Sequence, residues 1–357
     1  MKVDAVIGCL LGLAVGDALG LPREKLSRRR GDRIFPDADQ RHRFYRGRGL
    51  FSDDTEHACL TAQAMLRSGG QPELFQRELA RRLRWWAAAI PAGIGRATLA
   101  SCCKLWLGYS PQSSGVFSAG NAPAIRAPLL GICLGDDLEK LGAFLQASTR
   151  LTHTHPAAEY GAFAIAWAAR TSAMIPAEER VEPRPFVEEL RQVVRGDIFS
   201  SRLFDRLDAM VLSLEMGQST EEFANTMEWD RGVGGYVLET VPVALHAWQR
   251  HPTNFREAVG SVIRCGGDTD TTAAIVGALV GSRVGKAGIP SDWIEGIIDW
   301  PRSVTWVEEL GRELARGEWR ATPQKAKPLA VWAIPLRNAF FLACVLKHGL
   351  RRLLPPY

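Results

Sequence analysis

The sequence predicts an all-α protein, and three observations support this fold class. Apolar residues recur every three to four positions along most of the chain, as they do in helices that bury one face. The Asn-Gly and Asp-Gly pairs that favour β-hairpins are absent. With 357 residues, 46% of them hydrophobic and 23% charged, the chain is long and apolar enough to bury a large core.

The first predicted helix is the run MKVDAVIGCLLGLAVGDALG at residues 1–20. Its apolar centre is similar to that of a secretion signal, but Asp4 precedes that centre, Asp17 interrupts it, and no small-residue cleavage site follows. We therefore expect a buried helix. Further helices are expected where the apolar spacing is clearest, at 73–88, 136–149, 156–175, 203–217, 235–249, 253–264, 267–283 and 304–316.

Two long connections, 20–50 and 109–122, are rich in Gly, Ser and Arg and have no periodicity of their own. Loops of this length inside a compact domain are usually functional, so we expect them to border a cleft. We expect one helical domain over 1–320, followed by a tail at 321–357 that begins with a linker at 321–328.

The tail is basic and rich in aromatic residues. Pro335 and Arg337 interrupt its apolar run, which is too short to span a membrane. We expect a helix packed on the domain with its basic end solvated; the alternative is a peripheral membrane or partner contact through Arg351 and Arg352.

The net charge of +5 comes from local Arg clusters, and no helix carries a basic stripe with interleaved aromatic residues, so a nucleic-acid partner is not indicated. The cysteines number seven and form no C-x-x-C pair. This usage favours reduced thiols in the core and a cytoplasmic protein, and it leaves the oligomeric state open.

The stretch FSDDTEH, at residues 51–57, places adjacent carboxylates at the start of an apolar helix. Helix N-termini favour acidic residues, and Asp53 with Glu56 fits a capping box. Taken alone, the stretch is therefore explained as a well-capped helix.

A second acidic helix start, CGGDTDTT at residues 265–272, makes that explanation insufficient. Asp268, Asp270 and the following threonines provide more oxygen atoms than the free N–H groups of one helix start require. Oxygen ligands without His or Cys favour Mg²⁺, Mn²⁺ or Ca²⁺. The two stretches together suggest a shared cation site.

Asp17 and Glu24 are two further acidic residues of interest. Asp17 lies near the C-terminal end of the first helix, where the helix dipole disfavours a negative charge, so it requires a positive partner or N–H donors. It is either a buried, hydrogen-bonded residue or a support for the cation site. Glu24 follows Pro22 in a flexible stretch. Without further evidence, it is explained as an exposed charged residue of a loop.

Five stretches in this order resemble the ADP-ribosylglycohydrolase family: GCLLGLAVGDALGLPRE (8–24), FSDDTE (51–56), SAGNAPAIRAPLLG (118–131), LTHTHP (151–156) and CGGDTDTTAAIVGALVG (265–281). The resemblance covers roughly residues 3–310. It implies an orthogonal helical bundle around a dinuclear metal cleft that holds two Mg²⁺ or Mn²⁺ ions.

The resemblance also implies roles for particular residues. The metal ligands would be Ser52, Asp53, Asp54, Asp268, Asp270 and Thr271. Residues contacting ADP-ribose would be Ser118, Gly120, Asn121, His153, Gly234, Gly235 and Tyr236. Glu24 matches an acidic residue that closes over the metals, and either Glu24 or Asp268 would activate water.

The implied activity is hydrolysis of the ribose anomeric bond in an ADP-ribosylated protein or small conjugate. Gly93 and Ala122 depart from the family pattern: arginine-directed relatives often carry Asp at the first position, and many members carry Gly at the second. The first departure leaves the acceptor open. The alternatives are a non-catalytic ADP-ribose-binding or structural relative, and a Mg²⁺-dependent all-α isoprenoid synthase, although the sequence lacks that class's DDxxD motif.

Overall fold

The computed structural model describes residues 2–36, 40–176, 179–194 and 196–354. In this part of the chain the regular structure is helical, and extended pairing is limited to isolated bridges such as Gly120 with Tyr236. The prediction of an all-α fold is therefore confirmed. The elements are α1 (Val3–Gly20), η1 (Leu21–Arg23), α2 (Arg28–Ile34), α3 (Asp53–Ser68), α4 (Pro72–Ala88), α5 (Arg96–Trp106), α6 (Ala122–Leu134), α7 (Leu138–Arg150), α8 (Pro156–Met174), α9 (Pro183–Val193), α10 (Ile198–Glu215), α11 (Thr220–Thr226), α12 (Val237–Arg250), α13 (Phe255–Cys265), α14 (Thr269–Val284), η2 (Lys286–Gly288), α15 (Ser291–Glu295), α16 (Val304–Ala315), η3 (Glu318–Arg320) and α17 (Ala333–Arg351).

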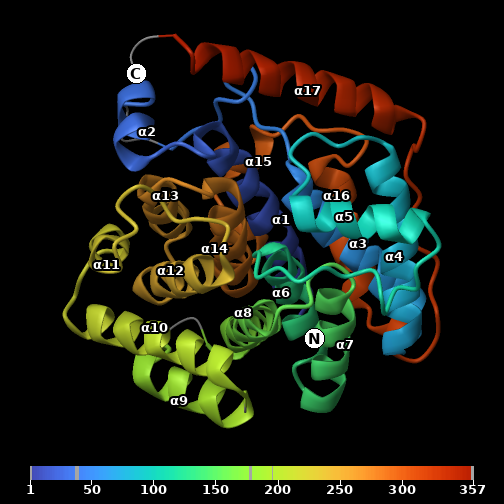
Figure 1. The fold of residues 1–357 in the computed structure, drawn as a ribbon, viewed down its shortest axis with the longest axis horizontal. Helices are drawn as coiled ribbons and strands as arrows, with labels where there is room; N and C mark the ends of the chain where they lie inside the picture. The colour runs from blue at the N-terminus through green and yellow to red at the C-terminus, as the bar shows by residue number, and fades with distance from the viewer. Residues whose placement is uncertain (1, 37–39, 177–178, 195, 355–357) are drawn as a thin grey trace.

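Helices α1 and α14 lie side by side at the centre of the molecule (Figure 1). They approach closely because glycines face each other: a Cβ atom added to Gly12 would lie 2.1 Å from the carbonyl oxygen of Gly277. At the end of α1 a Cβ on Gly20 would lie 2.6 Å from the Cα atom of Asp270. This contact brings the C-terminal end of α1, with Asp17, to the acidic start of α14.

The expectation that the N-terminal run is a buried helix is confirmed. Within the described residues one helical stretch, Val3–Arg23, is long and apolar enough to cross a membrane by length and composition, and its apolar window is entirely buried in the protein. The described cysteines are free thiols, and all are buried except Cys103, which is exposed on α5.

The structure contains helices that the apolar spacing did not predict. The 20–50 connection includes α2, a seven-residue helix rich in Arg, which is too short to show a period. Helix α6 is apolar on nearly all sides and contains Pro128, so it has no polar face that would reveal its helical spacing.

The tail runs as an extended segment along α3 and α16 and ends in α17, which lies along one edge of the molecule (Figure 1). The inner face of α17 places Phe341 and Cys344 against Leu21, Phe44 and Leu50. The expectation of a packed helix is confirmed, but its basic end is only partly solvated. Arg351 is exposed, whereas Arg352 turns inward and donates hydrogen bonds to backbone carbonyls.

Candidate active site

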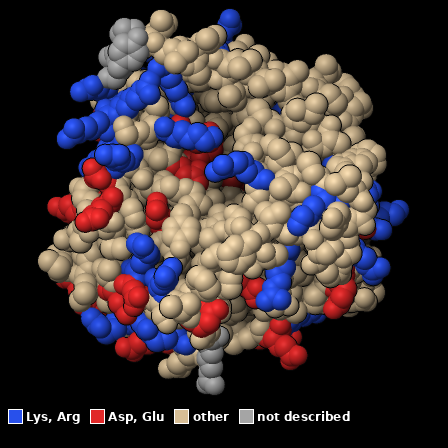
Figure 2. Space-filling view, viewed as in Figure 1, with Lys and Arg blue, Asp and Glu red and all other residues tan. Residues whose placement is uncertain are grey.

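Both acidic helix starts open into one cavity of about 360 Å³. It is bordered by the starts of α3 and α14, the loop after η1, and glycine-rich connections. The lining residues are Glu24, Lys25, Asp53, Asp54, Gly93, Gly95, Thr98, Asn121, Ala122, Ile125, Gly234, Gly235, Gly267, Asp268, Asp270 and Thr271. Figure 2 shows a hollow near the centre of the face that it draws, with acidic side chains at its base and basic side chains near its edge. Glu24 and Lys25 come from the 20–50 connection, and Asn121 and Ala122 come from the end of the 109–122 connection. Both connections therefore border the cavity, as expected.

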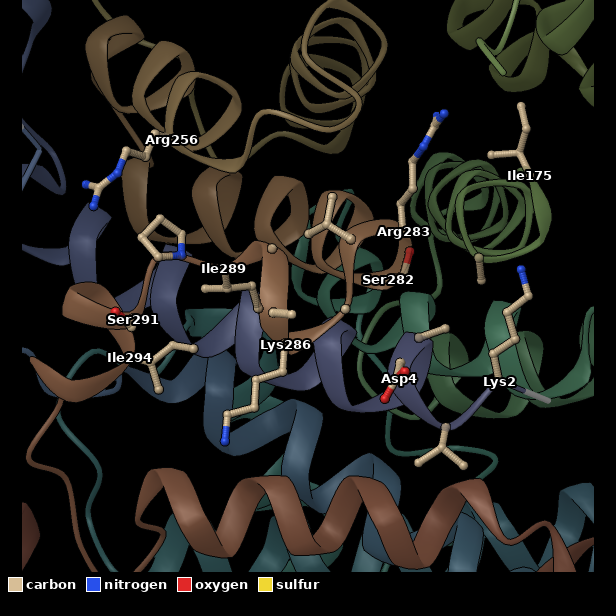
Figure 3. Close-up of a pocket in the computed structure, with 18 of the residues that line it drawn as sticks. Lys2, Asp4, Ile175, Arg256, Ser282, Arg283, Lys286, Ile289, Ser291 and Ile294 are labelled. Carbon is tan, nitrogen blue, oxygen red and sulfur yellow. The ribbon is translucent and has the colours of Figure 1, made fainter. Parts of the chain in front are cut away.

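A larger cavity, of about 1080 Å³, lies at the opposite end of the α1–α14 pair (Figure 3). Its charged side chains come from separate elements and spread around it: Lys2 and Asp4 lie at the N-terminus, Arg256 on α13, and Lys286 in η2. No converging set of polar groups distinguishes it within the described residues. The acidic cavity is therefore the candidate active site.

The start of α3 is capped by Ser52, whose hydroxyl accepts a hydrogen bond from the backbone N–H of Asp54 at 3.1 Å. The interpretation of Asp53 and Glu56 as a capping box is wrong. Glu56 points into the core instead, where its carboxylate lies 2.6 Å from Arg302 and accepts a hydrogen bond from Trp86 at 2.7 Å. Although burial raises the pKa of Glu56, the Arg302 guanidinium holds it below its ordinary value.

Asp17 of α1 stabilises the start of α3 by accepting hydrogen bonds from it. Its carboxylate accepts hydrogen bonds from the backbone N–H groups of Ser52, at 2.9 Å, and Thr55, at 3.1 Å, and from the Thr55 hydroxyl. The requirement for N–H donors, which the dipole argument predicted, is met. Burial nevertheless raises the pKa of Asp17 to about 7, even though these hydrogen bonds lower it.

The start of α14 is positioned by the glycine-rich connections. Asp268 precedes the helix and its side chain makes no capping hydrogen bond; it accepts one from the side-chain amide of Asn121 at 2.7 Å. The same Asn121 amide contacts the Thr240 hydroxyl at 3.0 Å, and that hydroxyl donates to the carbonyl of Gly234 at 2.9 Å. Asn121 thereby links the 118–121 segment, which the resemblance places against ADP-ribose, directly to the second acidic start.

The buried carboxylates of the cavity disfavour one another's negative charge. Burial, and after it the charges of neighbouring acids, raises the pKa of Asp53, Asp54 and Asp270 well above the ordinary value. One oxygen of Asp54 and one of Asp270 are buried without any hydrogen-bond partner. Buried polar atoms are rarely left unpaired, so these oxygens call for a cation or proton.

The residues present fit divalent ions of the oxygen-preferring kind. Within the described ranges no three His, Cys, Asp or Glu side chains form a group arranged to hold a metal ion by themselves. The unpaired oxygens of Asp54 and Asp270, with the Thr271 hydroxyl beside them in the cavity, are the donor types that Mg²⁺ and Mn²⁺ accept alongside water. The metal site stays a prediction that these oxygen atoms support.

Mg²⁺ should stabilise the protein more strongly as the pH rises from about 5 to about 7. In the unfolded chain, Asp17 and the cavity acids lose their protons near pH 4. In the folded chain they keep them to higher pH, to about 7 for Asp17. Without metal, the free energy of unfolding therefore falls as the pH rises through this window. A bound cation relieves that repulsion. Buried histidines such as His153, whose pKa burial lowers, make the free energy of unfolding rise with pH instead. Their contribution is the same with and without metal, so it drops out of the difference between the two samples.

The measurement is the difference in melting temperature between samples in Mg²⁺ and in EDTA, taken across this pH range. A difference that stays constant with pH would show that these carboxylates do not hold the ion.

Several residues implied by the resemblance lie outside the cavity lining. Ser52 caps α3, and the Ser118 hydroxyl accepts from the N–H of Gly120 at 3.3 Å. His153 is buried behind Gly120, where a Cβ would lie 2.9 Å from its Nε2 atom; burial lowers the pKa of His153 to about 3. Tyr236 is partly exposed at the start of α12. Their assigned roles stay predictions.

The sequence reasoning missed Lys25, Thr55 and Thr98. Lys25 forms an ion pair with Glu24 at 2.6 Å at the cavity edge, and Thr98 lines the cavity from α5. Thr55 was part of the quoted acidic motif, but only the fold reveals its bond to Asp17, because the two residues come from different helices.

The fold and this cavity define a class: a helical protein that buries one cluster of carboxylates between two helix starts. The chain belongs to the ADP-ribosylglycohydrolase family, whose model matches residues 2–323.

Relatives with assigned activities fall in the same family. The chain is 24% identical over 327 residues to the ADP-ribosylarginine hydrolase Tri1 of Serratia proteamaculans, covering 87% of this chain and 79% of the relative. It is 25% identical over 305 residues to the ADP-ribosyl-[dinitrogen reductase] glycohydrolase of Rhodospirillum rubrum, covering 82% and 89%. A solved structure entitled "ADP-ribosylglycohydrolase-related protein complex" superposes with a TM-score of 0.63 at 23% identity, covering 88% and 98%, and supports the fold.

Proposed function

We propose that this protein is a metal-dependent hydrolase that releases ADP-ribose from a modified protein or a small conjugate. The observation that carries the proposal is the meeting of two acidic helix starts in one cavity, with buried oxygens of Asp54 and Asp270 left unpaired. The relatives named as hydrolases of ADP-ribosyl conjugates support the reaction class.

In this proposal Asp53, Asp54, Asp270 and Thr271 hold two Mg²⁺ or Mn²⁺ ions, together with Asp268 and water. Such ions supply a water of lowered pKa at neutral pH and orient ribose hydroxyls. The protein itself must accept a proton and leave room for the sugar.

Two carboxylates are suited to accept that proton. Asp268 is oriented by the Asn121 amide, so one of its oxygens is fixed in direction. Glu24 lines the same cavity and forms an ion pair with Lys25. At Gly235 a Cβ would lie 3.0 Å from the Asp268 carboxylate, so this glycine keeps the space beside the proton acceptor open.

The decisive experiment is incubation of the full chain with ADP-ribosyl conjugates of defined linkage, in Mg²⁺ and in EDTA, following free ADP-ribose. We expect release that requires the metal. Binding of ADP-ribose without release would favour a non-catalytic relative. Turnover of a prenyl diphosphate instead would favour the isoprenoid synthase alternative.

Gly93 offers a test of acceptor choice. It lines the cavity with a φ of 95°, a conformation that favours glycine, and its added Cβ would lie 3.5 Å from a carboxylate oxygen of Asp53. Gly93→Asp alone would therefore combine backbone strain with a new charge. The matched control is Gly93→Asn, which carries the same strain without the charge.

Relative to Gly93→Asn, we expect Gly93→Asp to raise the ratio of turnover on ADP-ribosyl-arginine to that on ADP-ribosyl-serine by about tenfold, because only the arginine conjugate gains a charge-assisted hydrogen bond. The ratio of kcat/KM values is the measurement. Equal ratios in the two variants would show that this loop does not select the acceptor.

A further inference from the structure

The last turn of α17 is joined to the loop that carries Glu24. The Arg352 guanidinium donates one hydrogen bond to the carbonyl of Glu24 and another to the carbonyl of Pro22, both at 3.0 Å. Arg352 is itself held, because the Arg30 side chain donates to its backbone carbonyl. One side chain from the tail thus donates hydrogen bonds to two carbonyls of a loop more than three hundred residues earlier in the chain.

The same loop is held on its other side by the start of α14. The Lys25 N–H donates to the carbonyl of Gly267 at 2.7 Å, and the Gly267 N–H donates to the carbonyl of Leu26 at 2.8 Å. Residues 22–26 therefore lie between the glycine pair that precedes Asp268 and the end of α17. Leu21, which precedes the loop, packs against Phe341 of α17.

Glu24 needs such a restraint to stay at the cavity. Its carboxylate lies among acids of like charge, and its charge acts unfavourably on Asp53, Asp268 and Asp270. Its ion pair with Lys25 is a weak anchor, because the Lys25 side chain is 75% exposed. Without the main-chain contacts, repulsion would favour turning Glu24 out into solvent.

We propose that Arg352 is a positioning residue that acts through the main chain of residues 22–24 to hold the Glu24 carboxylate over the acidic cavity. Helix α17 lies beyond residues 2–323, which the family model matches, so this chain completes its site with an element outside that match. This inference rests on the proposed function for the role of Glu24, whereas the grip on the loop does not depend on it.

Arg352 also carries a positive charge near Glu24 and Asp270, so charge and hydrogen bonding must be separated. Arg352→Ala removes both. Arg352→Lys keeps the charge but replaces the planar fork, which matches two carbonyls, with a single ammonium group. Arg351→Ala is the matched control, because Arg351 lies in the same helical turn and is exposed.

The full-length variants are compared by three measurements: hydrogen exchange of the residue 24–26 amides, Mn²⁺ affinity by calorimetry, and kcat with KM. Arg352→Lys should raise loop exchange and weaken Mn²⁺ binding by roughly tenfold each, the effect of losing one of the two charge-assisted hydrogen bonds. Arg352→Ala loses both bonds and should show larger changes in the same direction. Both variants should lower kcat more than they raise KM, and Arg351→Ala should match the parent protein.

Unchanged loop exchange in Arg352→Ala would overturn the proposal, as would parent-like behaviour of Arg352→Lys in all three measurements, which would assign the effect to charge alone. If the parent protein neither binds Mn²⁺ nor releases ADP-ribose, the proposed function fails. Loop exchange then still decides whether Arg352 holds the loop.

Discussion

Replacing Asp270 with Asn should abolish ADP-ribose release, lowering kcat by about a thousandfold or more, because it removes a carboxylate from the proposed metal site. The same change should leave the helical content intact and raise the melting temperature of the metal-free protein. Asp270 is buried beside other acids that disfavour its charge, and a neutral amide relieves that repulsion. The measurements are free ADP-ribose, circular dichroism and thermal unfolding in EDTA.

The control for this variant is Asp205→Asn, which removes a carboxylate from the exposed side of α10. It should change neither turnover nor stability. Full activity in Asp270→Asn would remove the second acidic start from the proposed mechanism. A fall in metal-free stability would instead indicate that Asp270 supports the fold.

Replacing Arg337 with Ala should lower the free energy of unfolding by about 3–5 kcal/mol, the usual cost of leaving a buried carboxylate without its partner. Arg337 anchors α17 through two hydrogen bonds to Asp299, at 3.0 and 2.6 Å, and one to the carbonyl of Phe51 at 2.5 Å. Asp299 also accepts from the Phe51 N–H at 2.8 Å. This network lies directly before Ser52, so the loss should also loosen the start of α3.

Chemical denaturation of the full chain measures this effect, with Arg351→Ala as the exposed-arginine control on the same helix. A double variant that also carries Asp299→Asn should recover part of the loss, because it removes the unpaired charge. A loss smaller than about 1 kcal/mol in Arg337→Ala, the value typical of exposed pairs, would show that α17 docks mainly through its apolar face.

The sequence was sufficient to predict the helical fold, because the apolar spacing of elements such as α4, α13 and α16 follows directly from one buried face per helix. It also located Asp53, Asp54, Asp268 and Asp270, because surplus carboxylates at a helix start are visible in a few consecutive residues. Helix α6 escaped detection because burial on nearly all sides removes the period.

Partners far apart in the chain were not predictable in the same way. The capping-box interpretation of Glu56 followed local rules, yet its carboxylate forms an ion pair with Arg302, which lies 246 residues away. Nothing in the neighbourhood of Glu56 encodes that contact. Similarly, the sequence predicts a solvated basic end for the tail, but Arg352 donates hydrogen bonds to the carbonyls of Glu24 and Pro22.

Residues close together in the chain were enough to predict most of the helices, the oxygen-rich chemistry of two helix starts and the family resemblance. The tertiary structure decided that both starts face one cavity, that Asp17 supports the first of them, and that α17 reaches the loop of Glu24. These contacts depend on how closely glycines let α1 approach α14 and on which buried charges find partners. Both are properties of packed helices that no short stretch of sequence contains.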